Sequence, residues 1–146
     1  MLSICINNIG DFPMLTLPKS LSDCKDKNEY VVSNEWFTID STHSGYNITI
    51  GREYTVYGIL MYNDTIRYLI FNDDNIPCFF HSDLFSVLDN DIMWDWKIQR
   101  YSINDKNCLL LAYPQLTESY SNLIGIITGN PINIKQLLEY KDKLLF

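Results

Sequence analysis

The fold is set by residues 52–71, which read REYTVYGILMYNDTIRYLIF. Residues 52–62 are rich in β-branched and aromatic side chains and carry no helical stripe, which predicts a strand. Asn63-Asp64-Thr65 follows as a turn, because Asn and Asp tolerate left-handed backbone conformations and bond their own backbone. Residues 66–71 then supply a second strand. The whole stretch therefore predicts a β-hairpin.

Three further strands are expected downstream of this hairpin. After a turn at residues 72–75, residues 76–80 predict a short strand, and Pro77 within it indicates either an edge position or an irregular start. Residues 108–112 are apolar throughout, which favours a central strand. Residues 92–101 alternate between apolar and polar side chains, which predicts a strand with one buried face. That buried face would carry Ile92, Trp94, Trp96 and Ile98.

Two segments between and after these strands have helical character. Residues 82–88 predict one or two helical turns capped by Ser82. The side chains expected to point inward from these turns are Leu84, Phe85 and Leu88. Residues 119–125 fit either a short helix or a loop.

The clearest helix is expected at residues 132–145. Asn133 is the expected N-cap, and Gln136 would complete a capping box. Ile132 and Leu137 match the spacing of a hydrophobic staple. At helical spacing, one face of this segment carries Ile134, Leu137, Leu138, Lys141, Leu144 and Leu145. We expect this face to pack on the sheet.

These elements predict an α+β fold. It consists of a β-rich antiparallel meander sheet of about five strands with a C-terminal helix packed on it, because the strands are consecutive in sequence. Residues 1–146 are expected to form a single domain, long enough to bury a core without disulfides or metals. Within it, residues 1–50 are a mixed N-terminal segment, residues 52–112 form the sheet, and residues 132–145 form the helix. Residues 30–37 fit either a helix or a strand.

The charge favours basic partners, since 18 acidic residues against 11 basic ones give a net charge of -7. This charge disfavours direct binding to nucleic acid or to an anionic membrane. No window approaches the length of apolar sequence that a membrane span needs. The first residues lack the basic and apolar regions of a signal peptide, so a cytoplasmic location is expected. The four cysteines, Cys5, Cys24, Cys78 and Cys108, lack zinc-site spacing and are expected to be reduced and buried.

The main functional signal is the stretch from Tyr68 to Trp96, which contains six aspartates and no lysine or arginine. Large aromatic residues are interleaved with these acids, and this combination suggests a surface that attracts a basic partner and anchors it. The residues predicted to contact the partner are Asp73, Asp74, Asp89, Asp91, Phe79 and Phe80. Turn formation alone also accounts for the acids at positions 73–74 and 89–91.

Catalysis is not favoured by the sequence. His81-Ser82-Asp83 contains the residue types of a catalytic triad, but neighbours in sequence seldom converge on one reacting atom. Asp89-Asn90-Asp91 begins like a calcium loop but lacks the required glycine. The phosphate-binding and nucleophile-elbow motifs are also missing from the sequence. We therefore predict no catalytic residues, no metal and no cofactor, and a binding protein rather than an enzyme.

Residues 52–101 resemble small bacterial immunity proteins of polymorphic toxin and contact-dependent growth inhibition systems. The resemblance is carried by four runs, Tyr54–Tyr62, Arg67–Ile70, Leu84–Asp89 and Trp94–Trp96. It implies a protein that binds and neutralises a cognate toxin domain, often a nuclease, inside the producing cell. It implies no particular contact residues, because these interfaces differ between cognate pairs.

The leading hypothesis is thus an immunity protein that blocks a basic toxin domain through a protein–protein interface. Two alternatives remain at this stage. One is a small hydrolase that uses carboxylates together with His81. The other is a structural or regulatory module that self-associates through exposed aromatic residues.

Overall fold

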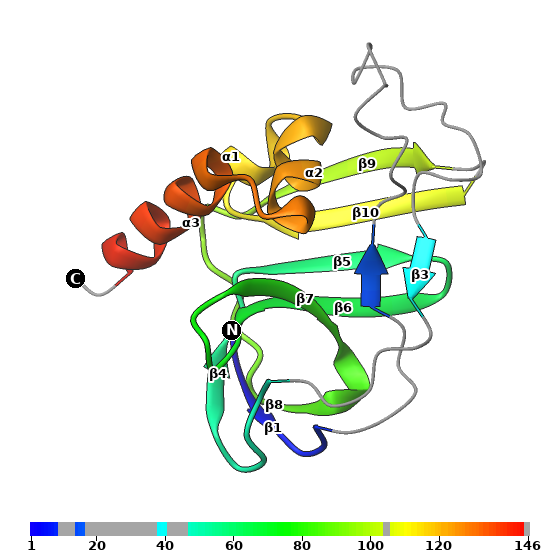
Figure 1. The fold of residues 1–146 in the computed structure, drawn as a ribbon. Helices are drawn as coiled ribbons and strands as arrows, with labels where there is room; N and C mark the ends of the chain where they lie inside the picture. The colour runs from blue at the N-terminus through cyan, green and yellow to red at the C-terminus, as the bar shows by residue number, and fades with distance from the viewer. Residues whose placement is uncertain (9–13, 17–37, 41–46, 104–105, 145–146) are drawn as a thin grey trace.

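The computed structural model describes residues 1–8, 14–16, 38–40, 47–103 and 106–144. Its architecture is α+β, as predicted, with antiparallel sheets and helices that follow them in sequence (Figure 1). The segment at residues 30–37, Cys24 and Leu145 lie outside the described residues. None of the described helices is long and apolar enough to cross a membrane.

A five-stranded sheet forms the centre of the molecule, in the order β7-β6-β5-β10-β9. Its strands are β5 (Gly58–Tyr62), β6 (Thr65–Phe71), β7 (Pro77–His81), β9 (Lys97–Ile103) and β10 (Lys106–Ala112). The predicted hairpin is confirmed, since Asn63 and Asp64 turn between β5 and β6 with φ of 52° and 62°. The predicted edge position of β7 and interior position of β10 are also confirmed. The order departs from a simple meander, because the β9–β10 hairpin returns to pair with β5.

A second, three-stranded sheet has the order β4-β1-β8. It contains β1 (Leu2–Cys5), β4 (Glu53–Thr55) and β8 (Phe85–Asp89). The single strand expected over residues 52–62 is therefore two strands in different sheets. The chain changes sheets where Val56 N–H donates to Met1 O at 2.9 Å and Tyr57 N–H donates to Leu69 O at 2.8 Å. Two short strands, β2 (Met14–Thr16) and β3 (Thr38–Asp40), pair separately.

The prediction of helical turns at residues 82–88 is wrong beyond Leu84. Ser82–Leu84 forms one 3-10 turn, and its N-cap is His81, whose Nδ1 accepts a hydrogen bond from Asp83 N–H at 3.1 Å. The chain then extends as β8 because it pairs with β1, about eighty residues earlier. Such tertiary pairing overrides local preference. Leu84 and Phe85 are buried as expected, but Leu88 is 50% exposed.

The prediction of a strand with a buried tryptophan face at residues 92–101 is also wrong in part. Strand β9 starts only at Lys97. Trp96 N–H donates to Met93 O at 3.2 Å, so the chain turns at residues 93–96 and the alternation is interrupted. Trp96 is buried, whereas Ile92, Trp94 and Ile98 are exposed.

Three helices follow the sheet: α1 (Pro114–Thr117), α2 (Tyr120–Thr128) and α3 (Pro131–Lys143). They lie on one side of the five-stranded sheet (Figure 1). Helix α2 resolves the open choice at residues 119–125, and Ser119 Oγ caps it by accepting from Asn122 N–H. The predicted cap of α3 is wrong. Its N-cap is Asn130, which accepts from Ile132 N–H at 3.0 Å, while Asn133 is buried inside the helix and contacts Asn122.

The core lies between the large sheet and the helices and continues into the small sheet. The buried face of α3 carries Leu137 and Tyr140. Arg67 is also fully buried, and it donates a hydrogen bond to Thr65 Oγ1. Of the described cysteines, Cys5 and Cys108 are buried and Cys78 is half-buried, and all three thiols are free. Burial raises the pKa of Cys78 to about 11 and that of Cys108 to about 12.

Candidate functional site

Asp73 serves to hold the fold together. Its carboxylate accepts hydrogen bonds from Thr49 Oγ1 at 2.5 Å, from Tyr54 OH at 2.6 Å and from Arg52 Nη1 at 2.8 Å. The bonds from Thr49 and Tyr54, with a smaller contribution from Arg52, lower the pKa of this carboxyl group. Asp73 thus fastens the turn after β6 to the segment that leads into β4, and its oxygens are already occupied.

Asp74 is similarly engaged, through its side chain with Asn47 and through its backbone within the turn. Asn47 Nδ2 donates to the Asp74 carboxylate, and Asp74 N–H donates to Asn72 Oδ1 at 3.0 Å. Asn75 in the same turn has a φ of 61°. The predicted turn at residues 72–75 is therefore present, and both of its acids bond to side chains of residues 47–54.

Phe79 and Phe80 do not lie on the surface. They are 4% and 2% exposed, respectively. Adjacent strand residues point to opposite faces of a sheet, so both faces of β7 are covered here. Phe80 packs against Phe85 of the small sheet, with ring centroids 6.5 Å apart. The prediction that these phenylalanines contact a partner is corrected, because both belong to the core.

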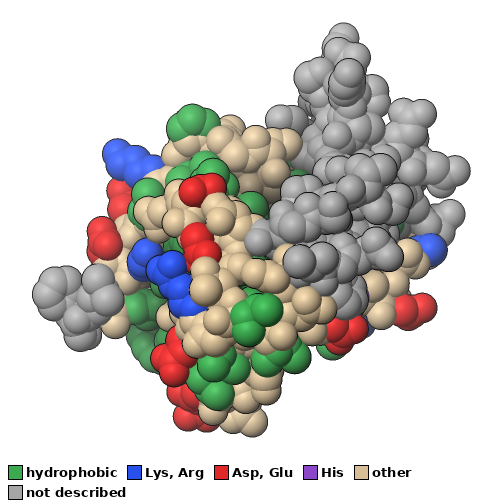
Figure 2. All heavy atoms as spheres, turned by 60° about the horizontal axis from the view of Figure 1, so that its bottom comes forward, with side chains coloured by type: hydrophobic (Ala, Val, Ile, Leu, Met, Phe, Trp, Pro, Cys, Tyr) green, Lys and Arg blue, Asp and Glu red, His purple; other side chains and the backbone are tan. Residues whose placement is uncertain are grey.

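Asp89 and Asp91 are exposed, and they lie among exposed apolar side chains. Asp91 N–H donates to Asp89 Oδ1 at 2.9 Å, which shapes the turn after β8. We use the name β8 margin for the exposed residues of this strand end and the following loop: Val87, Leu88, Asp89, Asp91, Ile92 and Trp94. Figure 2 brings the lower end of the molecule in Figure 1 forward, and it shows acidic, basic and hydrophobic side chains interspersed on that face.

Trp94 is the most exposed large apolar residue described, at 95%. The loop that carries it is fixed on both sides. Trp96 is buried, and Asp95 accepts a hydrogen bond from Tyr140 OH of α3 at 2.8 Å. Met93, just before Trp94, packs against the core. The indole is therefore presented to solvent by a braced turn, which lowers the entropy cost of using it in binding.

An apolar hollow adjoins the β8 margin. It has a volume of about 580 Å³ and is lined by Met1, Ile59, Val87, Leu88, Asn90 and Ile92. Ile59 belongs to β5 and Val87 to β8, so the hollow lies where the two sheets meet. It offers space for an apolar side chain from a partner, with the carboxylates of the β8 margin nearby in sequence.

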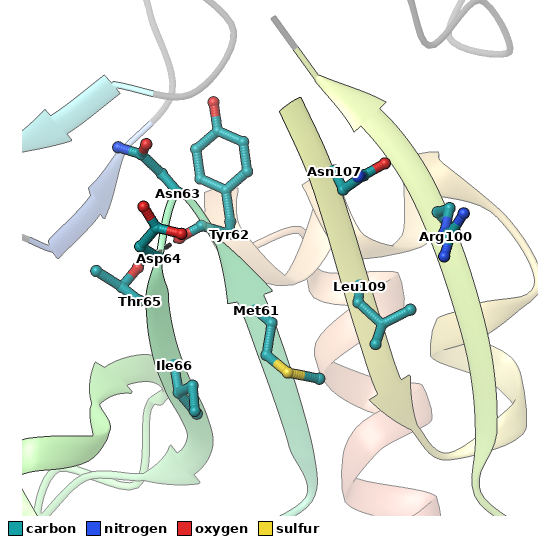
Figure 3. Close-up of a pocket in the computed structure, with 9 residues that line it drawn as sticks. All are labelled: Met61, Tyr62, Asn63, Asp64, Thr65, Ile66, Arg100, Asn107 and Leu109. Atoms are coloured by element: carbon teal, nitrogen blue, oxygen red, sulfur yellow. Dashed lines mark hydrogen bonds between the residues drawn. The ribbon is translucent and has the colours of Figure 1, made fainter. Parts of the chain in front are cut away.

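A second hollow, of about 470 Å³, lies on the face of the large sheet that points away from the helices (Figure 3). Met61, Ile66 and Leu109 lie side by side there on neighbouring strands. Ile59 and Met61 are two residues apart on β5 and so share this face. On this face the partly exposed apolar side chains lie among polar and charged ones, such as Asp64 and Arg100 in the second hollow.

The alternative catalytic group around His81 shows little convergence. His81 Nδ1 already accepts the Asp83 N–H and lies 3.7 Å from the Asp83 carboxylate. Burial lowers the pKa of His81, partly opposed by Asp83. Within the described ranges, no three His, Cys, Asp or Glu side chains are grouped so that they could hold a metal ion. The four acids predicted as contacts divide between two separate turns.

The sequence predicts Asp89 and Asp91 as contacts, and the structure places both on the surface, but the sequence does not predict the exposed apolar residues beside them. It assigned Trp94 and Ile92 to a buried face and Leu88 to a helix. One signal in the sequence does indicate that Trp94 is exposed. Asp89 and Asp91 favour a turn just before it, and a turn interrupts the alternation expected of a strand.

Comparisons of the chain with protein-family models, curated proteins and solved structures found no match.

Proposed function

We propose that this protein binds a cognate basic toxin domain through the β8 margin and neutralises it, in the manner of an immunity protein. The observation that carries the proposal is Trp94, which is 95% exposed on a braced turn, two residues after Ile92, which lines the hollow. Exposed tryptophans are favoured as interface anchors, because each ring can bury about 150–250 Å².

Charge supports a basic partner. Asp89 and Asp91 lie in a stretch of sequence without lysine or arginine, and the whole chain has a net charge of -7. An acidic surface accelerates the approach of a basic partner and orients it. Nuclease domains are commonly basic because they bind phosphates. The resemblance to immunity proteins leads to the same class of partner.

The first test is capture followed by neutralisation. We expect the tagged protein to retain one stoichiometric basic polypeptide from its host at low salt and to release it at high salt. Adding the protein back to that polypeptide in a one-to-one ratio should abolish its toxic or nucleolytic activity. A captured chain whose activity persists in the complex would contradict the proposal.

Paired variants locate the interface. Trp94→Ala and Ile92→Ser should each weaken binding by tenfold or more, corresponding to about 1.4 kcal/mol or more. Ile132→Ser is the matched control, because Ile132 is 69% exposed at the start of α3 and is not one of the residues of the β8 margin. Equal losses from Ile92→Ser and Ile132→Ser would rule out the β8 margin as the interface.

Self-association is the second candidate, since the exposed Trp94 and the apolar sheet face could also pair with another copy. Sedimentation would distinguish it. Self-association would be favoured over a foreign partner if the molar mass of the wild-type protein doubles as its concentration rises, while the Trp94→Ala protein stays monomeric.

A further inference from the structure

We infer that the partner joins the small sheet as an added strand, by pairing its backbone with the outer edge of β8. The occupant is an extended segment that carries apolar residues next to lysines or arginines. This inference rests on the proposed function, because it specifies how the β8 margin would hold its basic partner.

The backbone direction of β8 supports the inference. On β1, the odd-numbered residues bond to the β4 side: Cys5 N–H donates to Arg52 O, and Val56 N–H donates to Met1 O. Hydrogen-bonding direction alternates along an antiparallel strand, so Ser3 also bonds toward β4. Ser3 is the register partner of Val87. The Val87 N–H and C=O therefore point away from β1, toward the open edge.

This edge has no strand beside it in the described part of the chain. By the same alternation, Ser86 uses its backbone groups to pair with Ile4 of β1. Phe85 N–H is taken by Ser82 O within the 3-10 turn. The backbone N–H and C=O of Val87, at the middle of β8, therefore point outward. An added strand would form its hydrogen bonds with these two groups.

The other edges of the large sheet and the small sheet carry features that discourage added strands. β7 begins at Pro77, which cannot donate to a ladder, and β9 carries Lys97 and Arg100. β4 is only three residues long and begins with Glu53. β8 reads Phe-Ser-Val-Leu-Asp, with no proline and no base, and its last four residues are exposed. The register of β8 with β1 shifts after Val87, so the regular edge ends there. A regular edge without proline or a basic residue is where strand addition is expected.

The side chains around the edge define the occupant. Val87, Leu88 and Ile92 line the apolar hollow, which can receive alternate side chains of an extended segment. Asp89 and Asp91 follow immediately along the chain and favour lysine or arginine at neighbouring positions. A second copy of this chain would bring its own aspartates to the same place, so charge disfavours self-pairing at this edge.

The test measures amide hydrogen exchange of the full chain by NMR, with a blocked peptide of about ten residues in which valine and lysine alternate. At saturating peptide and low salt, we expect the exchange of the Val87 amide to slow by tenfold or more. A peptide of the same length that alternates valine and glutamate should leave this amide unchanged. Val87→Pro removes the outward donor and should abolish peptide binding, while Val87→Thr keeps the donor and should preserve it.

The outcomes separate this inference from the proposed function. Peptide binding with unchanged exchange at Val87, or no peptide binding, overturns strand addition even if a basic toxin is captured and neutralised. Slower exchange at Val87 supports strand addition even if no toxin is found. Protection of Val87 that rises with protein concentration alone, without peptide, would assign the edge to a second copy and overturn the basic partner. The exchange measurement uses the unchanged protein, so it holds if Val87→Pro fails to fold.

Discussion

At the scale of single residues, Asp73 shows how a feature that looks functional in sequence can be structural. The sequence places an acid in a turn, and the structure confirms the turn. The partners of the carboxylate, Thr49 and Tyr54, are 24 and 19 residues away in sequence. A single sequence carries no signal for contacts at such separations. The acids of the two turns could therefore be identified, but their different roles could not.

Asp73 should make stability depend on pH in a defined direction. Its folded-state pKa is lowered, so its contribution is fully present above the unfolded value of about 3.9 and is lost as the pH falls through the folded value. We expect Asp73→Asn to reduce the free energy of unfolding by about 1 kcal/mol at pH 7, a modest cost for a partly exposed site. Urea unfolding of both proteins should show this difference shrinking below pH 4.

The control for this prediction is Asp142→Asn, because Asp142 is exposed at the end of α3 and has no hydrogen-bonded partner of this kind to lose. Its effect should be small at every pH. A pH-independent gap between the wild-type protein and Asp73→Asn would contradict the role assigned to the carboxylate.

At the scale of elements, the sequence predicts strands well where pairing is local and poorly where it is not. The β5–β6 hairpin was predicted from Asn63-Asp64, because the turn itself determines which strands pair. The sequence of β8 suggests helical turns instead, because its strand partner, β1, lies about eighty residues earlier in the chain and leaves no local signal. The exposure of Trp94 was missed for a related reason, since one turn at residues 93–96 shifts the alternation.

The contact between α2 and α3 depends on the small size of Gly125. A Cβ added at this position would lie 1.8 Å from Asn133 Oδ1. Asn133 is 6% exposed and bonds to Asn122 Oδ1 at 3.1 Å, so its amide has little room to move. We expect Gly125→Ala to lower the free energy of unfolding by about 1–3 kcal/mol through overpacking, although alanine is the better helix former.

A double mutant tests the cause of this loss. Asn133→Ala removes the side chain that the new methyl group would meet. In the Gly125→Ala/Asn133→Ala protein, the alanine at position 125 should cost little or even stabilise, so the two changes should be strongly non-additive in thermal unfolding. Additive losses would show that Gly125 matters for a reason other than this contact.

At the scale of the whole molecule, the three described helices all lie on one side of the large sheet. The helices cover one face of the large sheet, and the hollows with Ile59 and Met61 lie on the other (Figures 1 and 3). The sequence predicted the covering helix but could not predict the open face, because a strand that is apolar throughout looks alike whether its second face meets protein or water. The β8 margin borders this face. Apolar side chains that could anchor a partner and aspartates that could attract it therefore lie in one region.

This arrangement predicts that the position of charge, rather than its total amount, controls association with the partner. Asp89→Asn with Asp91→Asn removes two negative charges at the β8 margin, and Glu139→Gln with Asp142→Asn removes two on the exposed side of α3. Both proteins therefore have the same net charge. In stopped-flow measurements at low salt, the first pair should slow association with the captured basic partner by about tenfold and flatten its salt dependence, and the second should change it far less.

The two charge variants separate local steering from a general effect of acidity. If the approach were driven by the field of the whole protein, both pairs would slow association equally, since each removes the same share of the net charge of -7. Equal slowing would thus contradict a localised acidic interface. Unequal slowing, with dissociation rates that respond to Trp94→Ala and much less to the charge changes, would assign steering to the aspartates and anchoring to the tryptophan, as expected for rim charges around a buried anchor.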